Sequence, residues 1–357
     1  MRSFAVWYKK NTDDKNIDTN TSGTTNNEVK ADIHVNLWET KICKTDDSSV
    51  CIDFGVMVYD MSQVLELCVY CPFPVTKNDI RDLGDCIIQN TSLVGAIFNE
   101  DYQICTGVPR RITVSNRNNN HFIIYALDIN NDLTLENIPQ EEHNSSHGTI
   151  LSFDFKNLLQ GDYGTDTEGQ KKYYFRFRVR VNLSELRLMF QENNNISPLQ
   201  DAFVITQVID FRLNNLRSCN QMIRDRFAKD EKFDIQSVHY LLLRRATDVF
   251  IHQGEHVSSR LLEQVLWKKY IEELNENVIA YHFKAKTKEV GKIADFCILT
   301  RFEYHQINWL RVLCYIYIVI FLSVIAGLLT AALQGNEFCA IIIGFIILLI
   351  AIYYLKK

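Results

Sequence analysis

The sequence predicts an α+β, β-rich cytosolic domain, built as a sandwich or a strongly twisted antiparallel sheet, followed by a C-terminal two-helix transmembrane hairpin. Two uncharged apolar stretches, 312–333 and 338–355, lie in the C-terminal part. Before them, short segments rich in β-branched and aromatic residues alternate with polar, turn-like segments, as in β-rich folds. Residues 173–182 alternate apolar and polar side chains throughout, so they are expected to form a strand with one buried face.

The domain limits follow from the same patterns. We expect the cytosolic domain over residues 1–305 and the membrane hairpin over 306–357. Residues 11–29 are rich in Asn, Thr and Asp and lack the apolar content that offsets ordering entropy, so they predict a mobile loop. The polar segment 160–172 offers a sub-boundary, but the strand pattern resumes after it, which favours one domain.

In the first half of the domain, strands dominate. Residues 77–83 predict a short helix with Thr76 as its N-cap, whereas 92–99 fit a helix or a strand. Pro72 and Pro74 end the strand before them. Strands are expected at 3–8 (an edge strand), 33–42, 50–59, 64–73, 111–114, 122–129 and 149–155.

The second half adds strands and one longer helix. Residues 259–274 predict that helix, because one side is lined by Leu262, Val265, Leu266, Lys269 and Leu274. Strands are expected at 173–182, 202–213, 233–251 (broken in the middle), 278–286 and 294–302.

The two apolar stretches match the dimensions of a bilayer. Roughly 22 and 18 helical residues span about 33 and 27 Å, close to a hydrocarbon core of about 30 Å. Basic residues flank both outer ends, and the connecting turn carries an acid and no base, so both termini and the main domain are expected on the cytoplasmic side of the cell (inner) membrane. The expected interface residues are Trp309, Arg311, Tyr353, Tyr354, Lys356 and Lys357.

Small residues recur every four positions in both predicted spans. They are Ser323, Gly327 and Ala331 in the first, and Ala340 and Gly344 in the second. Small residues at this spacing let helix backbones approach closely in a membrane. The stripe therefore predicts packing within the hairpin, self-association between copies, or both.

Composition and the motifs that are missing from the sequence argue against several classes of function. The net charge of the 357 residues is −5, which argues against general nucleic-acid binding. The N-terminal residues lack the apolar run of a secretory signal, so the ten cysteines are expected to be reduced cytosolic thiols. The phosphate-loop, dinucleotide-binding and hydrolase motifs of glycine and serine are missing from the sequence, and we expect no cofactor.

One motif would support catalysis. His252, Glu255 and His256 match H-x-x-E-H, the inverted signature of zinc proteases, which needs both histidines on one helix face. Gly254 interrupts the motif, and the motif precedes the expected helix, so we expect no metal site. A membrane-tethered, metal-dependent hydrolase is the alternative function, with these residues the first to test.

A row of arginines offers a binding site instead. Arg176, Arg178 and Arg180 lie on the polar face of the strand at 173–182, where guanidinium groups can bind phosphates or carboxylates. Arg212 is a further candidate that tertiary folding could bring near them. A solvated sheet face, or pairing with acids on neighbouring strands, is the alternative explanation. The row predicts an unidentified anionic ligand or a protein partner.

Lysines also collect shortly before the hairpin, at positions 284, 286, 288 and 292. Each basic residue near an anionic leaflet is worth about 1 kcal/mol. Lysines on an exposed strand edge also oppose aggregation. The sequence supports both explanations.

The layout, a cytosolic domain ahead of two short spans, resembles that of two-span membrane effectors of bacterial immune systems. The leading hypothesis is a non-enzymatic, membrane-anchored sensor or effector. Its domain would bind a ligand or partner, and its hairpin would assemble in or perturb the lipid bilayer, in bacterial defence. A membrane scaffold that recruits a partner protein is a further alternative.

Overall fold

The computed structural model describes residues 3–11, 28–38, 49–116, 121–139, 147–158, 172–186, 189–194, 204–251, 257–271, 274, 277–287, 291–305, 309–334 and 341. The chain divides into two compact units. One comprises Met1–Glu192 and Gln207–Glu303, and the other comprises Asn193–Thr206 and Tyr304–Lys357. Most of the predicted mobile loop at 11–29 lies outside the described residues.

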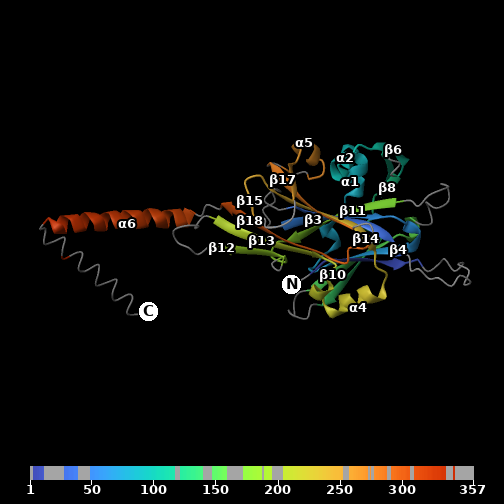
Figure 1. Ribbon diagram of the computed structural model, residues 1–357, viewed down its shortest axis with the longest axis horizontal. Helices are drawn as coiled ribbons and strands as arrows, with labels where there is room; N and C mark the ends of the chain where they lie inside the picture. Colours follow the sequence, from blue (N-terminus) through green and yellow to red (C-terminus); the bar gives the residue numbers. More distant parts are fainter. Residues whose placement is uncertain are drawn as a thin grey trace, which may run out of the picture. The chain divides into compact units, whose positions relative to one another are not determined.

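A large mixed sheet forms the centre of the first unit (Figure 1). In spatial order its strands are β16 (Ser258–Leu261), β17 (Val278–Lys286), β14 (Asp234–Arg245), β2 (Lys30–Trp38), β3 (Ser49–Val58), β11 (Lys172–Asn182), β8 (His121–Tyr125), β7 (Arg111–Ser115) and β6 (Gln103–Val108), with β5 (Ile80–Asp82) beside β11. The pairs β14–β2 and β11–β8 are parallel. The expectation of an antiparallel sheet is therefore wrong at these two pairs, although the β-rich class is confirmed.

The main core lies on one face of this sheet. Strand alternation selects its members: Ile33, Val35 and Leu37 of β2 are buried there. A second sheet faces the same core, with the order β1 (Ala5–Lys10), β4 (Val64–Cys71), β10 (His147–Asp154) and β9 (Leu133–Pro139). The rings of Phe153 and Phe177 lie 4.7 Å apart and join the two sheets. As expected, the first strand is an edge strand.

Helices cover the outer faces. Helix α4 (Gln221–Lys229) packs Ile223 and Phe227 against the outer side of the second sheet. Helices α1 (Gly84–Gln89), α2 (Ser92–Phe98) and α5 (Gln264–Trp267) lie on the opposite side of the unit (Figure 1). A third sheet has the order β12 (Phe190–Asn194), β13 (Val204–Leu213), β18 (Phe296–His305) and β15 (Val249–Ile251).

Two helix predictions need correction. The segment 259–274 contains β16 and the short α5 rather than one long helix, and Val265, expected on the buried side, is 83% exposed. Leu262 and Leu274 of the predicted apolar side are buried, and so are Trp267 and Tyr270, which that side did not include. The segment 77–83 contains a 3-10 turn, Lys77–Asp79, followed by β5. Thr76 does cap this turn, in a capping box with Asp79.

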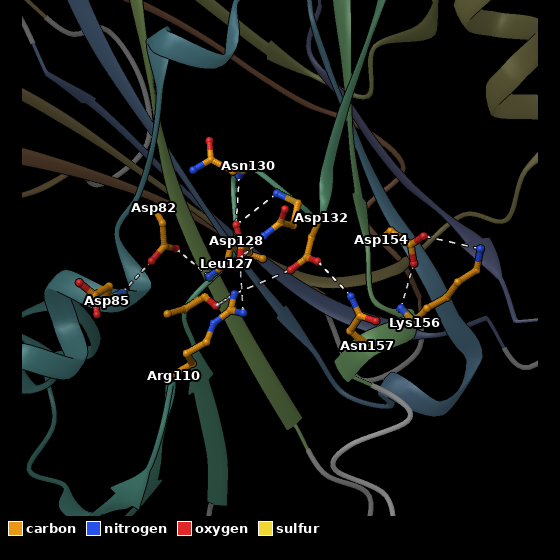
Figure 2. Close-up of polar contacts among 12 residues, drawn as sticks. Asp82, Asp85, Arg110, Leu127, Asp128, Asn130, Asp132, Asp154, Lys156 and Asn157 are labelled. Atoms are coloured by element: carbon orange, nitrogen blue, oxygen red, sulfur yellow. Dashed lines mark hydrogen bonds and ion pairs between the residues drawn. The ribbon is translucent and has the colours of Figure 1, made fainter.

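An acidic cluster fixes the loops around the start of β9 (Figure 2). The Asp128 carboxylate accepts the backbone N–H groups of Asn130 and Asn131, both at 3.2 Å. The Arg110 guanidinium lies 3.7 Å from both Asp128 and Asp132 and donates to a backbone carbonyl at 2.9 Å. Burial raises the pKa of Asp82 to about 6, although three backbone N–H groups donate to it. These contacts account for the cluster as a structural element.

The C-terminal part contains one candidate membrane helix among the described residues. Helix α6 (Trp309–Leu333) includes Val312–Ala331, with a mean hydropathy of 2.7 and none of its most apolar window buried. Its length and composition suit a bilayer span. The second predicted span, 338–355, lies outside the described residues except for Ile341. The structure thus supports one candidate membrane helix and does not support the two-helix hairpin.

A buried carboxylate joins three elements of the first unit. Asp53 on β3 is fully buried and forms a bidentate ion pair with Arg178 of β11. Arg178 Nε lies 2.6 Å from Asp53 Oδ1, and Arg178 Nη2 lies 3.1 Å from Asp53 Oδ2. Trp38 Nε1 donates to it at 2.7 Å and the Tyr270 hydroxyl at 2.8 Å. We call these four residues the Asp53 cluster. Its hydrogen bonds and ion pair connect β2, β3, β11 and the segment after α5.

Removing the Asp53 charge should destabilise the fold. Asp53→Asn leaves the Arg178 guanidinium buried without its counter-ion, which typically costs about 3–5 kcal/mol. The measurement is urea unfolding of the detergent-solubilised full-length chain. Asp154→Asn, which breaks an exposed pair with Lys156 at 3.6 Å, is the matched control and should cost less than about 1 kcal/mol. Equal effects of the two substitutions would contradict this role.

Candidate anion-binding site

On the side of α2 and α5, the large sheet presents polar residues in register. Lys284, His239, His34, Gly55 and Arg176 lie directly opposite one another on β17, β14, β2, β3 and β11. Neighbouring strands are about 4.7–4.9 Å apart, so the five positions form one line across the sheet. The four side chains other than glycine point away from the main core because each is one residue out of phase with the buried apolar positions of its strand.

A glycine in this line leaves room for a tyrosine. A Cβ on Gly55 would lie 2.2 Å from the Tyr174 hydroxyl, so a larger residue would displace the ring. The hydroxyl accepts a hydrogen bond from Arg176 Nη1 at 2.5 Å and lies 3.3 Å from His34 Nδ1. Tyr174 therefore links Arg176 to His34 across β3.

A cavity of about 440 Å³ opens over this line. That volume is within the range of small-molecule sites. Besides apolar groups it is lined by His34, Asn36, Asn99, Glu100, Arg176, His239, Ser258, Ser259, Arg260, Trp267, His282 and Lys284. We call it the anion pocket. Its walls come from β2, β11, β14, β16, β17, α2 and α5 and the residues after α2.

Two buried N–H donors of the lining residues lack a hydrogen-bond partner. Arg176 is 1% exposed; its Nε donates to the Tyr270 hydroxyl at 2.6 Å, but no described residue accepts from its Nη2. Trp267 is also 1% exposed, and its Nε1 has no acceptor among the described residues. Unsatisfied buried donors cost free energy, so a ligand with acceptor oxygens would stabilise both.

The charge of the pocket is unbalanced. Its lining contains three cations, Arg176, Arg260 and Lys284, and one acid, Glu100. Arg260 donates to neutral oxygens, the Asn99 amide at 3.0 Å and the Ala96 carbonyl at 2.9 Å. Arg176 reaches the Asp53 carboxylate only through Tyr270, and Arg178 already forms the ion pair with that carboxylate. The pocket is therefore suited to an anion.

Three imidazoles form part of its floor. The rings of His34 and His239 are 4.9 Å apart, and His239 Nδ1 lies 3.1 Å from His282 Nε2. Burial, together with nearby Lys284 and His282, lowers the pKa of His239 to about 4. Burial also lowers the pKa values of His34 and His282, assisted by the cations around them. The lowered pKa values favour the uncharged form of the three rings, which can donate or accept hydrogen bonds.

The four arginines proposed from the sequence have different surroundings. Arg176 lines the anion pocket, Arg178 is held by Asp53, and Arg180 is exposed. Arg212 lies on β13 in the third sheet and bonds Asp210 at 2.7 Å. The structure therefore brings one of them to the pocket. A solvated face does not describe this row, because Arg176 and Arg178 are both buried, whereas Arg178 does pair with an acid on a neighbouring strand.

Other predicted sites are not tested by the geometry. His252, Glu255 and His256 lie outside the described residues. The part of the chain that the structure describes contains no cluster of His, Cys, Asp or Glu able to hold a metal ion. In α6, a Cβ added at Gly327 would meet no atom of the described residues within 4 Å, so among these residues that side of the helix is open.

The three histidines of the pocket were not predicted from the sequence. His34, His239 and His282 lie in segments predicted as strands, but no role was predicted for them. Nothing in the strand pattern aligns three strands far apart in the chain, since the register is set by tertiary pairing. The recurrence of His at the same kind of position in three strands was the available signal.

Comparison with known proteins adds little. No family model matches the sequence, and a search of characterised proteins finds no match. A solved structure, the Fcho1 Mu homology domain of Danio rerio with a bound Eps15 peptide, is similar at a TM-score of 0.14 and 9% identity, over 78% of this chain and 79% of that one. A similarity at that TM-score carries no argument about this chain.

The histidines predict acid sensitivity of folding. Because the pKa of His239 is lowered in the folded state, the unfolded chain binds protons more readily, and stability is lost as pH falls from about 6.5 towards 4. The free energy of unfolding should therefore be larger at pH 7.5 than at pH 5, and His239→Asn should reduce that difference by about 1–2 kcal/mol. The figure is discounted because the His239 side chain is partly exposed. Urea unfolding at both pH values measures the difference. His121→Asn, at an exposed histidine, is the control and should leave the difference unchanged.

Proposed function

We propose that this chain is a membrane-anchored binding protein whose β-rich domain holds a small anion, of the phosphate or carboxylate type, in the anion pocket. The observation that carries the proposal is Arg176, a buried guanidinium that lines the pocket with one nitrogen left without an acceptor among the described residues. The proposal is of binding rather than catalysis.

The surroundings of Arg176 favour an anionic ligand over a neutral one. A buried charge is stable only when it is paired, and the Asp53 carboxylate pairs directly with Arg178 and reaches Arg176 only through the Tyr270 hydroxyl. An anion in the pocket would supply the second negative charge. Arginine can donate two parallel hydrogen bonds to a phosphate or a carboxylate, which suits both ligand types.

Inorganic phosphate is the probe for this site. Wild-type protein should bind it saturably in isothermal titration calorimetry at pH 7. Arg176→Gln should weaken binding by about 1.5–3 kcal/mol, or roughly 10- to 150-fold, because it removes a charged hydrogen bond. Thermal melting of each variant establishes that it is folded.

The same strand supplies the control for that experiment. Arg180→Gln makes the same chemical change at an exposed position outside the pocket, so binding should stay within about twofold of the wild type. Absence of saturable phosphate binding to the wild type would refute the proposal. So would equal weakening by both variants, or a folded Arg176→Gln protein with unchanged affinity.

For the membrane part, we propose that a second span over 338–355 returns the chain to the cytoplasmic side of the inner membrane and that copies associate through the small-residue stripe. The apolar composition of both stretches and the open side of α6 at Gly327 support this. Ligand binding in the domain would then alter the assembly of the spans. A role in bacterial defence rests on the resemblance of layout alone.

Cysteine labelling and crosslinking test this arrangement. Cysteines introduced at Lys357 and at Asn336 should be labelled from the cytoplasmic and the opposite side, respectively. Gly327→Ile should leave insertion intact, since isoleucine is at least as apolar, but reduce crosslinked oligomers. Labelling of both positions from one side would rule out the second span, and unchanged oligomers would remove the stripe from the contact. Ala331→Gly, which keeps the position small, is the control.

A further inference from the structure

A second hollow lies beside the anion pocket on the same face of the large sheet. Its volume is about 310 Å³, and its lining is Lys30, Asp32, Tyr59, Gln236, Ser237, Lys284, Lys286 and Thr287. Lys284 lines both hollows. We call this one the lysine hollow.

The two hollows occupy consecutive rows of the sheet. Lys286, Ser237 and Asp32 are opposite one another on β17, β14 and β2, two residues along from the row of Lys284 and His239. Two residues of a strand rise about 6.6–6.8 Å. The hollows are therefore neighbours at a spacing that one elongated small molecule can bridge.

The lysine hollow is also short of negative charge. Lys30, Lys284 and Lys286 line it, and none of them forms an ion pair with a described residue. Its one acid, Asp32, accepts hydrogen bonds from the Tyr59 hydroxyl at 2.8 Å and from Ser237 Oγ at 2.5 Å. The carboxylate is thus partly satisfied by neutral donors rather than by the lysines.

Strand pairing explains why these lysines are accessible. The edge strand β16 pairs only with the first part of β17, up to His282. Beyond that point β17 has β14 on one side and no described strand on the other. The segment that carries Lys284 and Lys286 is therefore open to a ligand from the edge of the sheet.

We propose that the two hollows form one extended site for an anion that carries at least two phosphate groups. One group binds at Arg176 and Arg260 in the anion pocket, the other at Lys30 and Lys286, and Lys284 contacts both. This inference rests on the proposed function, because it takes the anion pocket as the first subsite. Five cations face two acids across the combined lining, which suits a polyanion.

The test compares inorganic orthophosphate with tripolyphosphate on the full-length, detergent-solubilised protein. Tripolyphosphate should bind the wild type at least about tenfold more tightly, since it gains charged hydrogen bonds in the lysine hollow. The double substitution Lys30→Gln and Lys286→Gln should abolish most of that advantage and leave the affinity for orthophosphate within about twofold.

A charge-matched control separates this site from general attraction of polyanions. Lys156→Gln with Lys229→Gln removes the same charge from exposed positions outside both hollows, and should preserve the tripolyphosphate advantage. Loss of the advantage in both double variants, or in neither, would overturn the inference. So would equal wild-type affinities for the two anions.

Failure of this inference is distinguishable from failure of the proposed function. If orthophosphate binds and Arg176→Gln weakens it, but tripolyphosphate gains nothing, the extended site is refuted and the pocket stands. If neither anion binds, both are refuted. A final arm uses a nucleoside triphosphate, ATP, without divalent cations. Binding tighter than tripolyphosphate indicates that the ligand's phosphates belong to a nucleotide, and weaker binding indicates a free polyphosphate chain.

Discussion

The Asp53 carboxylate is the interaction on which the polar half of the first unit depends. It holds Arg178 and Trp38 directly, and through the Tyr270 hydroxyl it orients Arg176. Arg178 already neutralises this carboxylate, so Arg176, which bonds the cluster from outside through Tyr270, adds a buried guanidinium in excess. That excess charge lies at Arg176, which lines the anion pocket. The same contacts that join the strands therefore also determine the charge of the site.

Strand alternation made much of the fold predictable. Residues 173–182 alternate so regularly that the apolar face of β11 followed from the sequence, and β2 was assigned its apolar face in the same way. The burial of Arg176 and Arg178 on the other face of β11 did not follow. Helical spacing was less informative. In 259–274 the predicted apolar side contains the buried Leu262 but also the exposed Val265, and it omits Trp267, which is buried at the end of the short helix α5. The parallel pairs β14–β2 and β11–β8 depend on long-range contacts that no local pattern encodes.

The site was predictable only in part, for the same reason. Arg176, Arg178 and Arg180 look alike in the sequence, since they occupy equivalent positions of one strand. Their different environments come from the neighbours that tertiary pairing supplies: Gly55 beside Arg176, and Asp53 beside Arg178. The histidines show the opposite case. His34, His239 and His282 are far apart in the sequence, yet they share one environment because they meet on three adjacent strands.

The unbalanced charge is itself informative about function. An ion pair in a protein interior contributes little to stability compared with apolar residues of similar volume, and a buried cation without a partner is unfavourable. Arg178 has a structural explanation in Asp53, but Arg176 has a neutral environment of two tyrosine hydroxyls and an unsatisfied nitrogen. Folding alone would be served as well by an uncharged side chain at that position. Local departures from stability of this kind are typical of binding sites, where the ligand completes the interactions that the fold leaves open.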